Sequence, residues 1–114
     1  MRCPLAKRNM MALHEAGVRI AFGTDSGPRF QGYFEHLEMT MMADAGMDPA
    51  DILLTATGPA ADCMQLDDVG PLEPGQWADF VVLTRNPLKD IHNIHSIDSV
   101  WIGGNRVPDA RPPR

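Results

Sequence analysis

The first 65 residues contain a single strand-like run, and helical patterns lie on both sides of it. The run is Val18–Phe22 within GVRIAFGTDSG, where apolar side chains alternate with the period of a β-strand. Gly23, Asp25 and Gly27 are disfavoured in strand interiors and end the run. A lone strand leaves its backbone N–H and C=O groups without partners, so it cannot form a sheet by itself. We therefore expect this region to be the closing β/α unit of a larger parallel structure.

Four segments carry helical signals. Apolar spacing predicts helices over Leu5–Glu15, Phe34–Ala45, Pro49–Thr57 and a short further turn that reaches Met64. Gly17 and Gly46 are placed to end the first two helices, and Asp48 is placed to cap the third. The methionines at positions 39, 41, 42 and 47 follow the apolar spacing and are predicted to pack in the core.

The last part of the chain favours short strands and turns. A Pro-Gly turn precedes the β-rich run Phe80–Leu83. Two further short strands are predicted in IDSVWIGGNRV, joined at Gly103–Asn105. The linker before them, TRNPLKDIHNIHS, is interpreted as turns, with His92 and His95 on the surface.

The charge of the chain argues against several classes of partner. The net charge is −5 and the ten basic residues are scattered, so we expect no nucleic acid and no anionic membrane as partners.

No apolar stretch approaches the roughly 20 residues of a membrane-spanning helix. The start, MRCPLAKR, lacks the apolar core of a secretion signal. This favours a cytoplasmic location, although we expect the true N-terminus to lie upstream of Met1.

Asp25 is the first candidate functional residue. A strand over Val18–Phe22 delivers its carboxylate to the strand's carboxyl end, the edge of a parallel sheet at which ligands bind. By residue type alone, the alternative is a turn carboxylate that caps backbone amides. Thr24 and Ser26 flank Asp25 as small hydroxyl residues, which are common in tight turns and could orient the carboxylate or a substrate.

Five segments occur in a specific joint order: AGVRIAFGTDSG, HLEMTMMADAGMDPADILLTATGPAADCMQL, VGPLEPGQWADFVVL, NPLKDI and VWIGGNRV. Their order and spacing resemble the C-terminal third of the amidohydrolase superfamily, in its imidazolonepropionase-like and prolidase-like branch. The resemblance implies an α/β fold, with the last strand and helices of a metal-dependent hydrolase (β/α)8 TIM-like barrel over residues 1–65. Strands of a small β-sandwich would follow over residues 66–114. Because a whole barrel needs about 250 residues, the chain is expected to be a C-terminal fragment.

The resemblance also implies a chemistry. In the family, the aspartate that ends the eighth strand binds a catalytic divalent metal, commonly one or two zinc ions. It also moves a proton from the attacking water to the leaving nitrogen. Asp25 matches that residue, so it is predicted to be both metal ligand and catalytic residue. The implied reaction is hydrolysis of carbon–nitrogen bonds in small amides, cyclic amides or dipeptides. Two alternatives stay open: deamination of a heterocycle within the same superfamily, and a non-catalytic structural or partner-binding module.

The family's other metal ligands would lie upstream of this chain. They are a His-x-His pair, a carboxylated lysine or glutamate, and two later histidines. The resemblance places all of them before Leu5, and the chain contains none of them there. We therefore expect the chain alone to hold no metal and to be inactive. Its expected partner is the remainder of the same barrel, in a parent protein that could be a homo-oligomer.

Four further residues are candidate substrate contacts: Ser26, Arg29, Tyr33 and His36. Arg29 and Tyr33 belong to an aromatic-rich loop after the predicted strand, where a lid or specificity wall would lie. Interdomain packing is the alternative for that loop. For His36 the alternative is a solvent-facing or capping histidine, and joint metal binding with Glu38 is disfavoured because residues i and i+2 face different sides of a helix.

Overall fold

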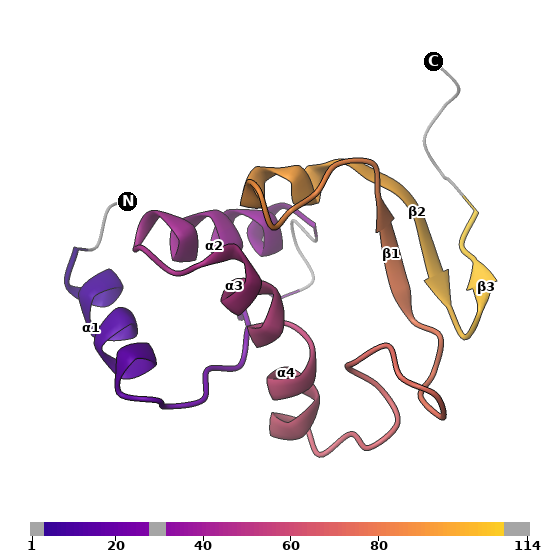
Figure 1. Cartoon of the computed structure of the whole chain (residues 1–114), viewed down its shortest axis with the longest axis horizontal. Helices are drawn as coiled ribbons and strands as arrows, with labels where there is room; N and C mark the ends of the chain where they lie inside the picture. The colour runs from indigo at the N-terminus through magenta and orange to yellow at the C-terminus, as the bar shows by residue number, and fades with distance from the viewer. Residues whose placement is uncertain (1–3, 28–31, 109–114) are drawn as a thin grey trace.

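Helix boundaries follow the sequence signals closely. The computed structural model describes residues 4–27 and 32–108, and Figure 1 shows its elements. Its α-helices are α1 (Pro4–Glu15), α2 (Tyr33–Asp44), α3 (Pro49–Thr55) and α4 (Gly58–Cys63). Gly17 and Gly46 adopt φ angles of 79° and 108° after α1 and α2, a conformation that glycine reaches without steric cost. The Asp48 side chain accepts a 2.9 Å hydrogen bond from the backbone N–H of Ala50, which confirms it as the cap of α3.

The strands form one antiparallel sheet in the last third of the chain. They are β1 (Phe80–Leu83), β2 (Ile97–Ile102) and β3 (Asn105–Arg106), in the order β1-β2-β3. Phe80 lies opposite Trp101 in the register, and their rings stack with centroids 5.6 Å apart. Such cross-strand aromatic pairs stabilise a sheet. The three predicted strands in this part of the chain are therefore confirmed.

The linker between β1 and β2 is more ordered than the sequence suggested. Residues Ile91–His95 form a 3₁₀ helix, η1, where only turns were expected. The Asp90 side chain caps it by accepting from the backbone N–H of His92 at 2.9 Å. Ile91 and Ile94, three residues apart, lie on the same side of such a helix and are both buried. Their burial stabilises a short helix that local propensity alone does not predict.

The hydrophobic core joins the helices to η1. Its buried members are Met42, Met47, Ile52, Ile91 and Ile94. Met39 is half-buried and packs against this cluster, so the predicted core role of the methionines is confirmed for positions 39, 42 and 47. The core therefore draws on side chains from both the first 65 residues and the last 49, which brings α2 and α3 against η1 (Figure 1).

The strand expected at Val18–Phe22 does not form in this chain. Residues 18–26 lie in neither a helix nor a strand, so this prediction is wrong at the level of the isolated chain. Among the described residues, its backbone hydrogen bonds run from the N–H of Val18 to the carbonyl of Leu13 at 3.0 Å and from the N–H of Phe22 to the carbonyl of Thr55 at 2.9 Å. A β-strand requires a neighbouring strand to pair with, and no described strand lies beside this segment. From residue 19 onward the period of two survives in the burial, because Ile20 and Phe22 pack against the core while Arg19 and Ala21 are exposed; Val18, at the start of the run, is exposed and departs from it.

No helix within residues 4–27 and 32–108 is long and apolar enough to cross a membrane.

Candidate functional site

Asp25 lies in an unusual backbone conformation. Its φ angle is 51°, in the left-handed region that residues other than glycine enter uncommonly and at an energetic cost. Its side chain is exposed and has no hydrogen-bond or ion-pair partner among the described residues. The alternative of a turn carboxylate that caps backbone amides is therefore not supported by the described contacts. Aspartate enters the left-handed region more often than most residues, so this conformation is compatible both with a turn and with a residue held for a ligand.

The two hydroxyl residues beside Asp25 contact each other. The Thr24 Oγ1 and Ser26 Oγ atoms are 3.0 Å apart, and Thr24 Oγ1 also accepts from the backbone N–H of Ser26 at 3.4 Å. Both residues are half-buried, whereas Asp25 between them is exposed. The contact therefore joins the two residues on either side of Asp25, and the Asp25 side chain takes no part in it.

Asp25 does not complete a metal site within this chain. Among residues 4–27 and 32–108, no group of three or more histidine, cysteine, aspartate or glutamate side chains could hold a metal ion together. One carboxylate suits a hard or borderline divalent cation as a single ligand, but a catalytic zinc site needs three protein ligands.

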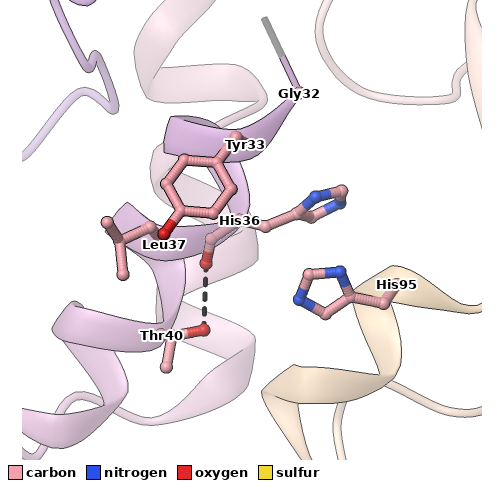
Figure 2. Close-up of a pocket in the computed structure, with 6 residues that line it drawn as sticks. All are labelled: Gly32, Tyr33, His36, Leu37, Thr40 and His95. Carbon is pink, nitrogen blue, oxygen red and sulfur yellow. Dashed lines mark hydrogen bonds between the residues drawn. The ribbon is translucent and has the colours of Figure 1, made fainter. Parts of the chain in front are cut away.

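The candidate substrate contacts fall into two places. Tyr33 and His36 line one open pocket of about 420 Å³, together with Gly32, Leu37, Thr40 and His95 (Figure 2). Ser26 lies in the turn with Thr24 and lines none of the described pockets. Arg29 lies outside the described residues. The structure therefore brings Tyr33 and His36 together but does not place Asp25 or Ser26 in their pocket.

His36 and His95 form a pair that sequence reasoning missed. Their ring centroids are 4.2 Å apart with an interplanar angle of 39°. Burial of part of its ring lowers the pKa of His95, and the neighbouring His36 and His92 imidazoles lower it further. The prediction that His95 lies at the surface is confirmed, since it is exposed, and His36 is half-buried; what was not expected is the contact between their rings. No local pattern signals this contact, because α2 and η1 are far apart in the sequence.

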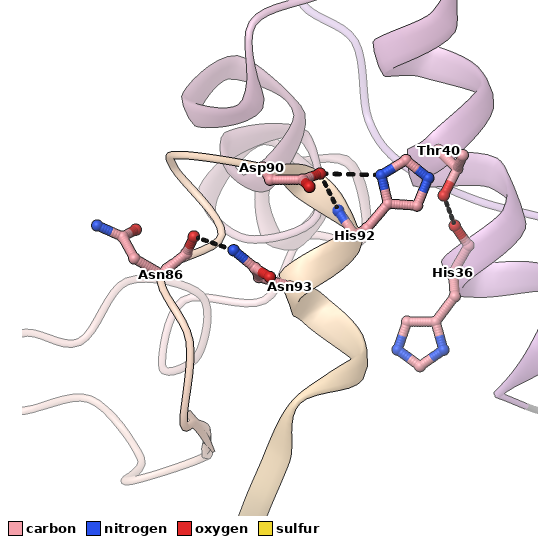
Figure 3. A network of polar contacts seen from close by, with 6 residues as sticks. All are labelled: His36, Thr40, Asn86, Asp90, His92 and Asn93. Carbon is pink, nitrogen blue, oxygen red and sulfur yellow. Dashed lines mark hydrogen bonds and ion pairs between the residues drawn. The ribbon is translucent and has the colours of Figure 1, made fainter.

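Polar contacts hold η1 in place next to this pair. Asp90 Oδ1 lies 2.9 Å from both the backbone nitrogen and the ring Nδ1 of His92, and Asn93 Nδ2 donates to the carbonyl of Asn86 at 2.8 Å (Figure 3). The two hydrogen bonds from His92 lower the pKa of Asp90, the backbone bond more than the side-chain bond. These contacts hold the N-terminal end and the middle of η1, the helix that carries His95.

Comparisons with known proteins agree on one family. The profile of the Amidohydrolase family matches residues 7–107. The imidazolonepropionase of Deinococcus deserti is 33% identical over 83% of this chain and 25% of its own length. The 5-methylthioadenosine/S-adenosylhomocysteine deaminase of Teredinibacter turnerae is 28% identical over 96% of this chain and 28% of its own length.

Among solved structures, a Xaa-Pro dipeptidase superposes with a TM-score of 0.82 at 29% identity. The match covers 93% of this chain and 26% of the dipeptidase. The chain thus spans about a quarter of the length of the relatives that it matches.

Proposed function

This chain belongs to the amidohydrolase family, and on that premise we propose that the complete protein is a metal-dependent hydrolase of carbon–nitrogen bonds. Residues 1–65 supply the closing β/α segment of its barrel, and residues 66–114 supply part of its β-sandwich. The premise is supported by a family match over most of the chain and by a TM-score of 0.82 to a Xaa-Pro dipeptidase.

The observation that carries this proposal is the state of Asp25. It has a φ angle of 51°, an exposed carboxylate and no partner among the described residues. The backbone of Asp25 keeps this conformation although none of the described residues forms a hydrogen bond or an ion pair with its side chain. We infer that its contact is with groups supplied by the rest of the barrel and by the substrate.

The burial pattern around Asp25 supports the same orientation. Ile20 and Phe22 pack against the core and Thr24 and Ser26 are half-buried, whereas the alternate positions 19, 21, 23 and 25 are exposed. In a β/α barrel, the strand face turned away from the helices is the barrel interior. Asp25 therefore belongs to the set of side chains that would point into the barrel at the end of its last strand.

We assign Asp25 two roles in the complete site: one ligand of the divalent metal, and acceptor of a proton from the attacking water. The metal, commonly zinc in this family, lowers the pKa of its bound water to about 7 and polarises the substrate carbonyl. Because this chain supplies one ligand only, we attribute no further step to it. We infer that the contact between Thr24 and Ser26 positions the Asp25 carboxylate, because it joins the two residues on either side of Asp25.

The substrate class that we propose is a small amide, cyclic amide or dipeptide. Tyr33 and His36 are its candidate contacts from α2, because they share an open pocket at the start of that helix. Arg29 and Ser26 remain candidates from the turn that follows Asp25. A dipeptidase among the similar structures supports the dipeptide option.

A second candidate is deamination of a heterocycle. The deaminase from Teredinibacter turnerae aligns with 96% of this chain, which favours this option over a non-catalytic module. Both reactions deliver an activated water to a carbon bonded to nitrogen. Release of ammonia from adenosine-type substrates, measured against release of amino acids from dipeptides, separates the two activities.

The test of Asp25 is made in the complete protein that contains this segment. We expect Asp25→Asn to lower kcat/KM by about 10²–10⁴-fold, because an amide accepts no proton at neutral pH and binds a divalent metal more weakly. Asp67→Asn is the matched control: Asp67 is also exposed, and its carboxylate has no partner among the described residues. Turnover of Asp25→Asn within twofold of the Asp67→Asn control would refute the assigned role.

A further inference from the structure

We propose that the imidazoles of His36 and His95 form a binding site for a divalent transition-metal ion of the Zn²⁺, Ni²⁺ and Cu²⁺ class. The ion would link α2 to η1, two elements whose sequence positions are far apart. Asp25 does not line the pocket of this pair, and the proposed hydrolysis does not use the pair as ligands. His36 is also a candidate substrate contact in the proposed function, but the tests below measure metal binding rather than turnover, so failure of this inference can be told apart from failure of the proposed function.

The two rings already lie side by side with free nitrogen atoms. Their centroids are 4.2 Å apart at an interplanar angle of 39°, and Figure 2 shows the two rings next to each other, one from α2 and one from η1. Neither ring has a hydrogen-bond or ion-pair partner among the described residues, since His36 uses only its backbone carbonyl, as acceptor from Thr40. An imidazole without a partner can offer its nitrogen lone pair to an ion.

The other two histidines of the chain provide a contrast. His14 Nε2 lies 3.2 Å from Asp51, and His92 Nδ1 lies 2.9 Å from Asp90. Each of these rings is engaged by one carboxylate and has no second imidazole in ring contact. His36 and His95 are thus the pair that offers two nitrogen ligands at one place.

The chemistry of the pair selects a cation rather than an anion. Imidazole binds Zn²⁺, Ni²⁺ and Cu²⁺ in its neutral form, whereas a phosphate or carboxylate ligand would require charged rings. Two adjacent charged imidazoles repel each other, and the lowered pKa of His95 agrees with a ring that stays neutral near pH 7. A hard cation such as Mg²⁺ or Ca²⁺ prefers oxygen ligands and is not expected here.

The site requires a small adjustment and has a rigid support. With metal–nitrogen bonds of about 2.0–2.1 Å, the centroids would separate by about 1 Å, which side-chain rotation in an open pocket allows. Tyr33 lines the same pocket, and water can take the remaining positions. His95 lies on η1, whose N-terminal end is capped by Asp90 and whose middle residue, Asn93, is hydrogen-bonded to Asn86 (Figure 3). Such support around a ligand increases metal affinity.

The first test is calorimetric titration of the full 114-residue chain, stripped of metal with a chelator, with NiCl₂. We expect one Ni²⁺ per chain, and we expect His36→Gln and His95→Gln each to weaken binding at least about tenfold. His14→Gln and His92→Gln are matched controls and should bind as the unmodified chain does. Unchanged binding in both His36→Gln and His95→Gln, or loss of binding in His92→Gln, would overturn the proposal.

A second measurement needs no variant and so does not depend on how the variants fold. Substoichiometric Cu²⁺ is added to the unmodified chain, and the imidazole proton signals are followed by NMR. We expect paramagnetic broadening of the His36 and His95 signals before those of His14 and His92. Equal broadening of all four histidines, or earlier broadening of His14 or His92, would show that no such site exists.

Discussion

Replacement of Ile52 by alanine tests whether the helices and η1 share one core. Ile52 is fully buried in α3, at 0% exposure, and it belongs to the cluster with Met42, Met47, Ile91 and Ile94. Its backbone N–H donates to the carbonyl of Asp48 at 3.0 Å, a bond that alanine keeps. The substitution therefore removes side-chain packing and leaves the helix hydrogen bond intact.

The expected loss follows from the atoms removed. Ile52→Ala deletes three carbon atoms, and at about 0.8 kcal/mol per buried methylene the lost transfer free energy is about 2.4 kcal/mol. Neighbours from α2 and η1 cannot fully close the space, so a cavity contribution adds to this figure. We expect the free energy of unfolding to fall by about 3 kcal/mol, within the range of about 2–5 kcal/mol typical of such changes.

Urea unfolding of the 114-residue chain, followed by tryptophan fluorescence, measures this loss. Leu54→Ala is the control, because Leu54 lies in the same helix with 57% of its surface exposed and should lose less than about 1 kcal/mol. Equal losses for the two variants, or a loss below about 1 kcal/mol for Ile52→Ala, would refute a core built between α3 and η1.

Two further predictions concern the Asp90 cap and the Thr24 bridge. The folded pKa of Asp90 lies below its unfolded value, so its ionised carboxylate stabilises the fold above about pH 4, and this contribution is lost as the pH falls through the folded pKa. Asp90→Asn keeps a capping oxygen, so its free energy of unfolding, measured by urea titration from pH 6 to 2.5, should fall less steeply than that of the unmodified chain. In the complete protein, Thr24→Val removes the hydroxyl that contacts the Oγ and the backbone N–H of Ser26 and should lower kcat by about tenfold with little change in KM. Thr24→Ser should restore kcat, and a failure of this rescue would show that the hydroxyl does not position Asp25.

Much of the fold could be predicted because its signals are local. Asp48 caps α3 through an amide two residues away, and Gly17 ends α1 through its own backbone conformation. The hairpin of β2 and β3 follows from adjacent glycines at 103 and 104, both with positive φ. Helix ends and tight turns depend on residues within four positions, so the sequence contains the necessary information.

Of the candidate site, only the identity of Asp25 could be predicted from the sequence. Asp25 is singled out by its position after an apolar run, together with the family resemblance, and both are visible in the order of the residues. Its left-handed backbone and the contact between Thr24 and Ser26 come from the structure, because turn residues of these types adopt several conformations. The role of Asp25 as ligand and proton acceptor stays a proposal until the complete protein is tested.

The sequence by itself determined where the helices end, where the last hairpin turns, and which carboxylate follows the apolar run. Only the tertiary structure decided that Ile91 and Ile94 complete a core with Ile52, that His36 meets His95, and that Val18–Phe22 lies outside any strand. The physical reason is the range of the interactions. Caps and turns are satisfied by neighbours in the chain, whereas core packing, ring pairs and strand ladders need partners that only folding, or another chain segment, brings into contact.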